Sequence, residues 1–127
     1  IQTEATHSST IQDGEKMLTG GDPTGFVVKL ENGFTIYHAG DTGVFAGMQI
    51  IGELYKPDLA LLPIGSHYTM GPLEASYAAK LIKPRYIIPM HYGTFPVLTG
   101  TPEEFKKLLD PSLNIEVIVL NPGEEIE

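Results

Sequence analysis

Two short apolar runs set the strongest limit on how this chain can fold. They occupy residues 59–64, L-A-L-L-P-I, and residues 86–90, Y-I-I-P-M. Neither run alternates between apolar and polar side chains, which is the pattern of a strand buried on both faces of its sheet. Such strands are usually parallel and are covered by helices. The two runs therefore predict the interior of an α/β layer structure.

The other elements follow from apolar spacing and from turn and cap residues. An Asn-Gly pair between two β-rich runs predicts a hairpin over residues 26–38. Residues 8–24, rich in Ser, Thr, Gly and Asp, are predicted to form a loop. Further strands are predicted at residues 1–6 and 115–120, and helices at residues 44–54, 72–82 and 102–109, the last with Thr101 as its N-cap. The predicted fold class is α/β, a single domain over residues 1–127 in which a strand and a hairpin precede three helix–strand units.

Three helices can cover only one face of a sheet of this size. The apolar runs call for cover on both faces, and the chain does not obviously contain a second covering layer. The sequence also begins at Ile1, without an initiator methionine and already in strand-like residues. We therefore expect a further segment, upstream or in another chain, to pack on the second face.

Composition removes several classes of function. The chain has 127 residues, and 42% of them are hydrophobic, as in a globular domain. Its formal charge of −8 argues against a broad surface for binding nucleic acid. It contains no cysteine, so any metal must be bound by histidine and carboxylate. No apolar run approaches the roughly 20 residues of a membrane span. We expect a soluble, cytoplasmic protein.

Asp41 lies at the end of the predicted hairpin, in A-G-D-T-G, with glycine before it and a second glycine two residues later. One interpretation is structural: a short carboxylate here can form an Asx-turn or cap a helix beginning near Val44. The other is that Asp41 binds or bridges metal ions. That interpretation requires histidine partners.

Histidines follow the other predicted strands. His7 ends the first strand, His67 follows residues 59–64, and His91 follows residues 86–90. Carboxyl ends of strands in α/β sheets are where side chains converge on a ligand. Each histidine alone could be a structural hydrogen-bond donor, but His7, Asp41 and His91 together form a set that zinc would accept.

Three further residues are candidates for supporting roles. His38 lies within the hairpin strand, as a hydrogen-bond partner of a metal ligand or as a core residue. His67, in P-I-G-S-H-Y-T-M-G, either faces the substrate or is a plain exposed histidine. Tyr92, beside His91, could donate a hydrogen bond to an anionic substrate or could simply pack.

The segments A-T-H-S-S, Y-H-A-G-D-T-G and P-M-H-Y-G-T, in this order and spacing, resemble the second half of a metallo-β-lactamase-fold protein. The resemblance is greatest to poorly characterised bacterial and archaeal metal-dependent hydrolases close to the L-ascorbate-6-phosphate lactonases, and L-L-P-I-G before T-M-G-P also fits them. It covers essentially the whole chain. It implies the carboxy-terminal half of a four-layer αββα sandwich.

The resemblance also implies roles for the three residues. His7 would complete the ligand set of one metal ion, Asp41 would bridge two ions, and His91 would bind the second. Two divalent ions are implied, with zinc expected and manganese or iron as alternatives. In this family a metal-bound hydroxide is the nucleophile, so the implied function is metal-dependent hydrolysis of an ester, lactone or phosphodiester of small size.

The chain departs from the family pattern in one large respect. The signature H-x-H-x-D-H, which supplies the remaining ligands and normally lies upstream, does not occur in these 127 residues. We therefore expect a fragment or one chain of a two-chain assembly, inactive alone and completed by an N-terminal half. A homo-oligomer is a second form of assembly compatible with the sequence. The alternative functions are a phosphodiesterase or nuclease of the same fold, which the acidic charge disfavours, and a non-catalytic assembly module.

Overall fold

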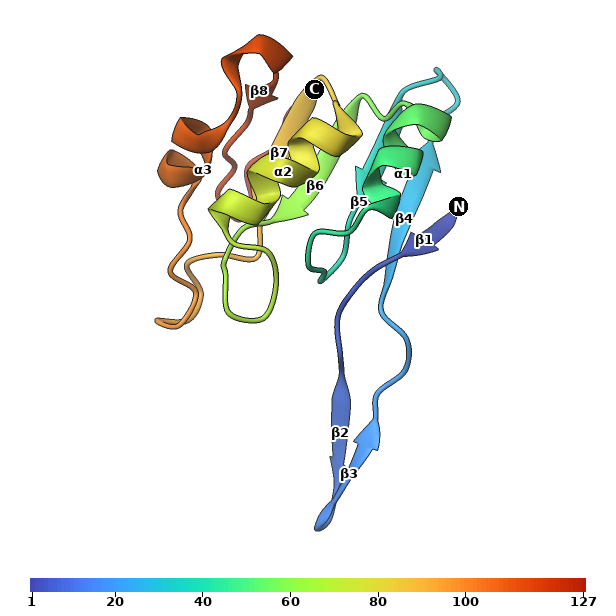
Figure 1. Ribbon diagram of the computed structural model, residues 1–127, viewed down its shortest axis with the longest axis vertical. Helices are drawn as coiled ribbons and strands as arrows, with labels where there is room; N and C mark the ends of the chain where they lie inside the picture. Colours follow the sequence, from blue (N-terminus) through green and yellow to red (C-terminus); the bar gives the residue numbers. More distant parts are fainter.

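The computed structural model describes residues 1–127 as one six-stranded mixed sheet with three helices on one face and a separate two-stranded hairpin (Figure 1). The sheet order is β1-β4-β5-β6-β7-β8. Strands β1, β4 and β5 pair antiparallel, whereas β5, β6, β7 and β8 pair parallel. The elements of the main body are β1 (Gln2–Glu4), β4 (Thr24–Lys29), β5 (Thr35–His38), α1 (Gly47–Tyr55), β6 (Leu59–Pro63), α2 (Pro72–Ile82), β7 (Tyr86–Met90), α3 (Pro102–Leu108), the 3₁₀ turn η1 (Pro111–Leu113) and β8 (Glu116–Val117).

Local signals account for most of these boundaries. The Asn-Gly turn between β4 and β5 closes as predicted, with Asn32 Oδ1 accepting a hydrogen bond from the Phe34 N–H at 2.9 Å. At the start of α3 the Thr101 hydroxyl accepts from the Glu104 N–H at 3.2 Å, so the predicted N-cap is confirmed. The three helix–strand units are also confirmed, and the helix predicted at residues 72–82 matches α2 at both ends.

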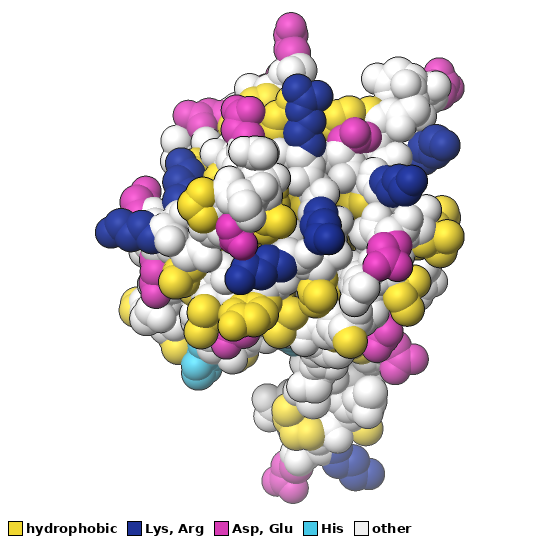
Figure 2. Space-filling model, turned by 45° about the horizontal axis from the view of Figure 1, so that its top comes forward, with side chains coloured by type: hydrophobic (Ala, Val, Ile, Leu, Met, Phe, Trp, Pro, Cys, Tyr) yellow, Lys and Arg dark blue, Asp and Glu magenta, His cyan; other side chains and the backbone are white.

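One prediction was wrong. Most of the loop predicted at residues 8–24 is a hairpin, β2 (Thr10–Asp13) paired antiparallel with β3 (Lys16–Thr19). It stands away from the main body in Figures 1 and 2, with Ile11, Met17 and Leu18 each about half exposed or more. Its strands mix polar and apolar residues without a buried face, so they lack the alternation that marks a strand in a sequence.

Two predicted element boundaries also differ from those in the structure. The helix predicted at residues 44–54 begins only at Gly47, because residues 41–46 form the connection from β5. The strand predicted at residues 115–120 is reduced to Glu116–Val117, which pairs only with β7 at the edge of the sheet. None of the three helices is long and apolar enough to cross a membrane.

The hydrophobic core lies between the sheet and its helices. Tyr37, Ala60 and Ile87 form one row across β5, β6 and β7 and are fully buried, and Met48 of α1 and Phe105 of α3 belong to the same cluster. The other face has no such cover. On β4 and just after it, Phe26, Val28 and Leu30 are 48%, 46% and 43% exposed. The expectation that the helices cover only one face is therefore confirmed.

Candidate metal centre

The loops that follow β5, β6 and β7 gather at one end of the sheet (Figure 1). These three strands are neighbours and parallel, so their carboxyl ends share one edge. Asp41 lies in the loop after β5, and His91 directly follows β7. The loop after β6, residues 64–71, lies between them.

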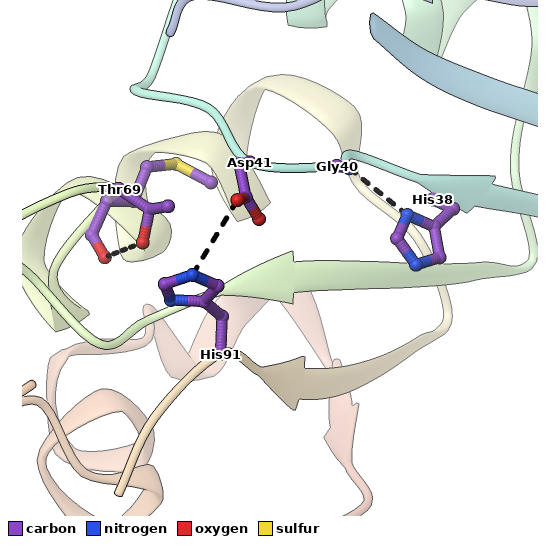
Figure 3. A network of polar contacts seen from close by, with 6 residues as sticks. His38, Gly40, Asp41, Thr69 and His91 are labelled. Atoms are coloured by element: carbon purple, nitrogen blue, oxygen red, sulfur yellow. Dashed lines mark hydrogen bonds and ion pairs between the residues drawn. The ribbon is translucent and has the colours of Figure 1, made fainter. Parts of the chain in front are cut away.

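Asp41 and His91 face each other across this edge. His91 Nε2 lies 3.7 Å from Asp41 Oδ2 (Figure 3), which is too long for a hydrogen bond. The Asp41 side chain is 53% exposed and that of His91 29% exposed. The N-cap of α1 is Ala46, which has no side-chain cap hydrogen bond, so Asp41 does not cap this helix. The carboxylate is left available to a ligand.

His91 does not act as a structural hydrogen-bond donor. Its Nδ1 atom is buried and has no hydrogen-bond partner. Buried polar atoms in folded proteins almost always have one, so an orphaned ring nitrogen calls for an explanation. An imidazole and a carboxylate that face each other without hydrogen bonds are donors of the kind that zinc and similar divalent ions accept.

Close backbone packing fixes both residues. Gly40, just before Asp41, has a φ of +69°, and a Cβ at this position would overlap the carbonyl oxygen of Thr24. His91 itself has a left-handed φ of +56°. Its carbonyl oxygen packs on Gly65, where a Cβ would overlap it. The two glycines therefore allow the approaches that aim Asp41 and His91.

Two threonines join the segment of His7 to that of Asp41. The buried Thr42 hydroxyl accepts from the Thr6 N–H at 2.8 Å and donates to the Gly43 carbonyl at 2.7 Å. The Gly43 N–H in turn donates to the Thr6 carbonyl at 2.8 Å. The residues next to His7 and Asp41 in the chain are thus bound to each other.

His7 nevertheless does not complete a ligand set within this chain. It is half-buried, and no three His, Asp or Glu side chains lie together closely enough to hold a metal ion. Asp41 and His91 are brought together. The three-residue set that includes His7 stays a prediction, and the donors present fit a divalent metal in kind but not in number.

The supporting candidates occupy different places. His38 is exposed, and its Nδ1 accepts from the Gly40 N–H at 3.1 Å, away from the Asp41–His91 pair (Figure 3). Tyr92 is half-buried and packs against the core, where burial, and then the charge of Glu103, raise its pKa, so its hydroxyl stays protonated. His67 is exposed at the tip of the loop after β6.

Thr6 and Thr42 were not identified from the sequence as parts of the site. Each is adjacent to a predicted ligand, in T-H and D-T, and that adjacency is the only signal the sequence carries. A threonine beside a turn is more often a local turn residue, and the pairing between the two spans 36 positions.

Replacing Thr42 by valine should loosen the link between these segments. The change keeps the shape but removes the partly buried hydrogen bonds to the Thr6 N–H and the Gly43 carbonyl, at a cost of about 1 kcal/mol. Urea denaturation measures this loss. Thr10→Val, on the exposed hairpin, is the matched control and should change stability by less than about 0.5 kcal/mol. Equal effects of the two variants would contradict the assigned role of Thr42.

Comparison with known proteins shows which family the chain belongs to. A family model described as the Beta-lactamase superfamily domain matches residues 1–92, a range that includes Asp41 and His91. The chain belongs to the beta-lactamase superfamily. The fold and the family expected from the three sequence segments are thereby confirmed.

Relatives of this beta-lactamase superfamily chain are named UPF0173 metal-dependent hydrolase. Those of Rubrobacter xylanophilus and Methanosarcina mazei are 56% and 52% identical to it, over 98% of this chain and 52% and 54% of their own lengths. A solved structure, the metallo hydrolase Igni18 of Ignicoccus hospitalis, matches 97% of this chain and 49% of its own with a TM-score of 0.81 and 48% identity. The chain spans about half the length of the curated relatives it matches.

Proposed function

We propose that this chain supplies part of the active site of a metal-dependent hydrolase, with Asp41 and His91 as metal ligands and His7 as a third. The observation that carries the proposal is the Asp41–His91 pair at the carboxyl edge of the parallel strands, 3.7 Å apart, with an orphaned nitrogen on the histidine. The names of the relatives, metal-dependent hydrolases at more than 50% identity, support it.

The remaining ligands are proposed to come from outside these 127 residues, from an N-terminal half in the same or another chain. Two observations support this. Within the chain no three donors lie together, and the second face of the sheet leaves Phe26, Val28 and Leu30 largely exposed. A layer packed on that face would cover them. The chain by itself is then expected to be inactive.

The proposed substrate is a small ester, lactone or phosphodiester, and about two divalent ions, zinc above all, would take part. Such ions, when bound, supply Lewis acidity and lower the pKa of water. This chain's own contribution is to position donors. Asp41 presents an unengaged carboxylate on a turn fixed by Gly40, and His91 presents its ring from the end of a buried strand. The partly exposed edge admits the substrate.

The test uses this chain together with its N-terminal half. Elemental analysis is expected to find about two divalent ions per assembly, and p-nitrophenyl esters or bis(p-nitrophenyl) phosphate are expected to be hydrolysed in proportion to metal content. Removal of metal by a chelator should stop turnover, and zinc should restore it. An assembly that binds no metal would rule the function out and favour a purely structural module.

A further inference from the structure

The loop after β6 is bound to both neighbouring strands. On one side the Met70 N–H donates to the carbonyl of Thr42, next to Asp41, at 3.0 Å. On the other side the Ile64 N–H donates to the carbonyl of Met90, next to His91, at 3.1 Å. The loop is thus held at both ends between the two candidate ligands. Its tip is formed by Ser66, His67 and Tyr68.

The tip is held in a conformation that costs free energy. Ser66 and His67 are consecutive and both left-handed, with φ of +67° and +64°. Residues other than glycine rarely occupy this region, and each such residue costs about 1–3 kcal/mol unless the surroundings enforce it. The turn is closed by the Ser66 N–H donating to the Met70 carbonyl at 3.0 Å. A glycine would fit this backbone better, so the side chain of His67 needs another reason to be there.

Packing does not supply that reason. His67 and Tyr68 are both exposed, Tyr68 by 58%, and neither belongs to the core. They contact each other instead, with ring centroids 4.3 Å apart and the planes at 84°, an edge-to-face pair. The contact restrains two aromatic rings that carry polar hydrogens, on a loop hydrogen-bonded to the residues next to Asp41 and His91.

We propose that His67 and Tyr68 bind an anionic group, a carboxylate or a phosphate, on the substrate whose ester bond is cleaved at the metal centre. This proposal rests on the function proposed above. An imidazole and a phenol can each donate a hydrogen bond to such an oxygen. The chain carries a formal charge of −8, so an anion needs local donors of this kind to approach the site.

The experiment compares two esters in the complete, metal-loaded assembly. Mono-p-nitrophenyl glutarate carries a carboxylate beyond the cleaved bond, and p-nitrophenyl butyrate does not. His67→Ala should raise the KM for the glutarate ester about 10-fold, with kcat changed by less than about 2-fold, and should leave the butyrate ester unaffected. Tyr68→Phe should raise the same KM by a smaller factor.

Tyr77→Phe, an exposed tyrosine on α2, is the matched control and should change neither ester. Equal losses on both esters, or no loss on the glutarate ester, would overturn the proposal. A wild-type assembly without metal or turnover would instead remove the proposed function. In that case the anion site is tested by adding glutarate and recording the NMR signals of the His67 ring. If these signals do not shift, the proposed anion site is overturned.

A second variant separates binding from structure. His67→Gly removes the ring and also relieves the left-handed backbone, so the assembly should gain about 2 °C in Tm while the KM for the glutarate ester rises as in His67→Ala. A lower Tm with an unchanged KM would show that His67 serves the fold, and would overturn the proposal.

Discussion

Replacing Asp41 by asparagine in the complete assembly is expected to lower kcat/KM by more than about 100-fold and to remove bound metal. The loss of a residue that only supports a metal ligand already costs about 10–100-fold, so the loss of Asp41, the proposed ligand, should exceed that. Asparagine keeps the size of the side chain but removes its charge. Elemental analysis and initial rates on one p-nitrophenyl ester measure the two effects.

Stability should respond very differently from activity. The Asp41 carboxylate does not cap α1 and only faces His91 at 3.7 Å, so its replacement should change the free energy of unfolding of the metal-free chain by less than about 0.5 kcal/mol. A helix cap, by contrast, would cost about 1 kcal/mol. Asp13→Asn, on the exposed hairpin, is the control and should alter neither activity nor metal content. An active, metal-loaded Asp41→Asn assembly would contradict the ligand assignment.

Replacing Gly65 by alanine is expected to destabilise the chain by about 3 kcal/mol and to displace His91. A Cβ at Gly65 would overlap the carbonyl oxygen of His91, which is backbone and cannot rotate away. Overpacking a close contact costs about 1–3 kcal/mol, and the upper end is expected where the obstacle is backbone. Urea denaturation measures the loss, and the metal content of the assembly reports the displacement of His91.

The control separates crowding from backbone strain. Gly14, in the turn of the β2–β3 hairpin, has a φ of +61° but nothing near its added Cβ. Gly14→Ala should therefore strain only the hairpin, by the left-handed penalty of about 1–2 kcal/mol, and leave the unfolding of the main body and the metal content intact. If Gly65→Ala retained full metal binding, the contact with Gly65 would not be what holds His91 in place.

The parts of the fold that were predictable are those where one local signal dominates. The continuous apolar runs specified β6 and β7, and Asn32-Gly33 specified the turn between β4 and β5. The β2–β3 hairpin was missed because no face of it is buried, so no alternation marks it, although Gly14-Glu15 between two short runs is a two-residue turn.

The approach of Asp41 to His91 was predictable from the sequence, whereas their role as metal ligands stays a prediction. Asp41 and His91 follow neighbouring parallel strands, and that topology explains why a pattern along the chain became a pair in space. Side-chain contacts between distant segments leave no such pattern in the sequence. Nothing in the sequence indicates that Thr6 pairs with Thr42, or that Ser66 and His67 adopt a left-handed backbone conformation.

The β2–β3 hairpin is expected to be less stable than the main body of the molecule. A two-stranded ribbon without a packed face is marginally stable in water, and this one joins the body through residues 5–9 and 20–23 alone. Its ladder can therefore open and close at a small fraction of the free energy that holds the core together. We therefore expect the chain to behave as two thermodynamic units: a cooperative body that carries Asp41 and His91, and an arm that opens and closes independently of it.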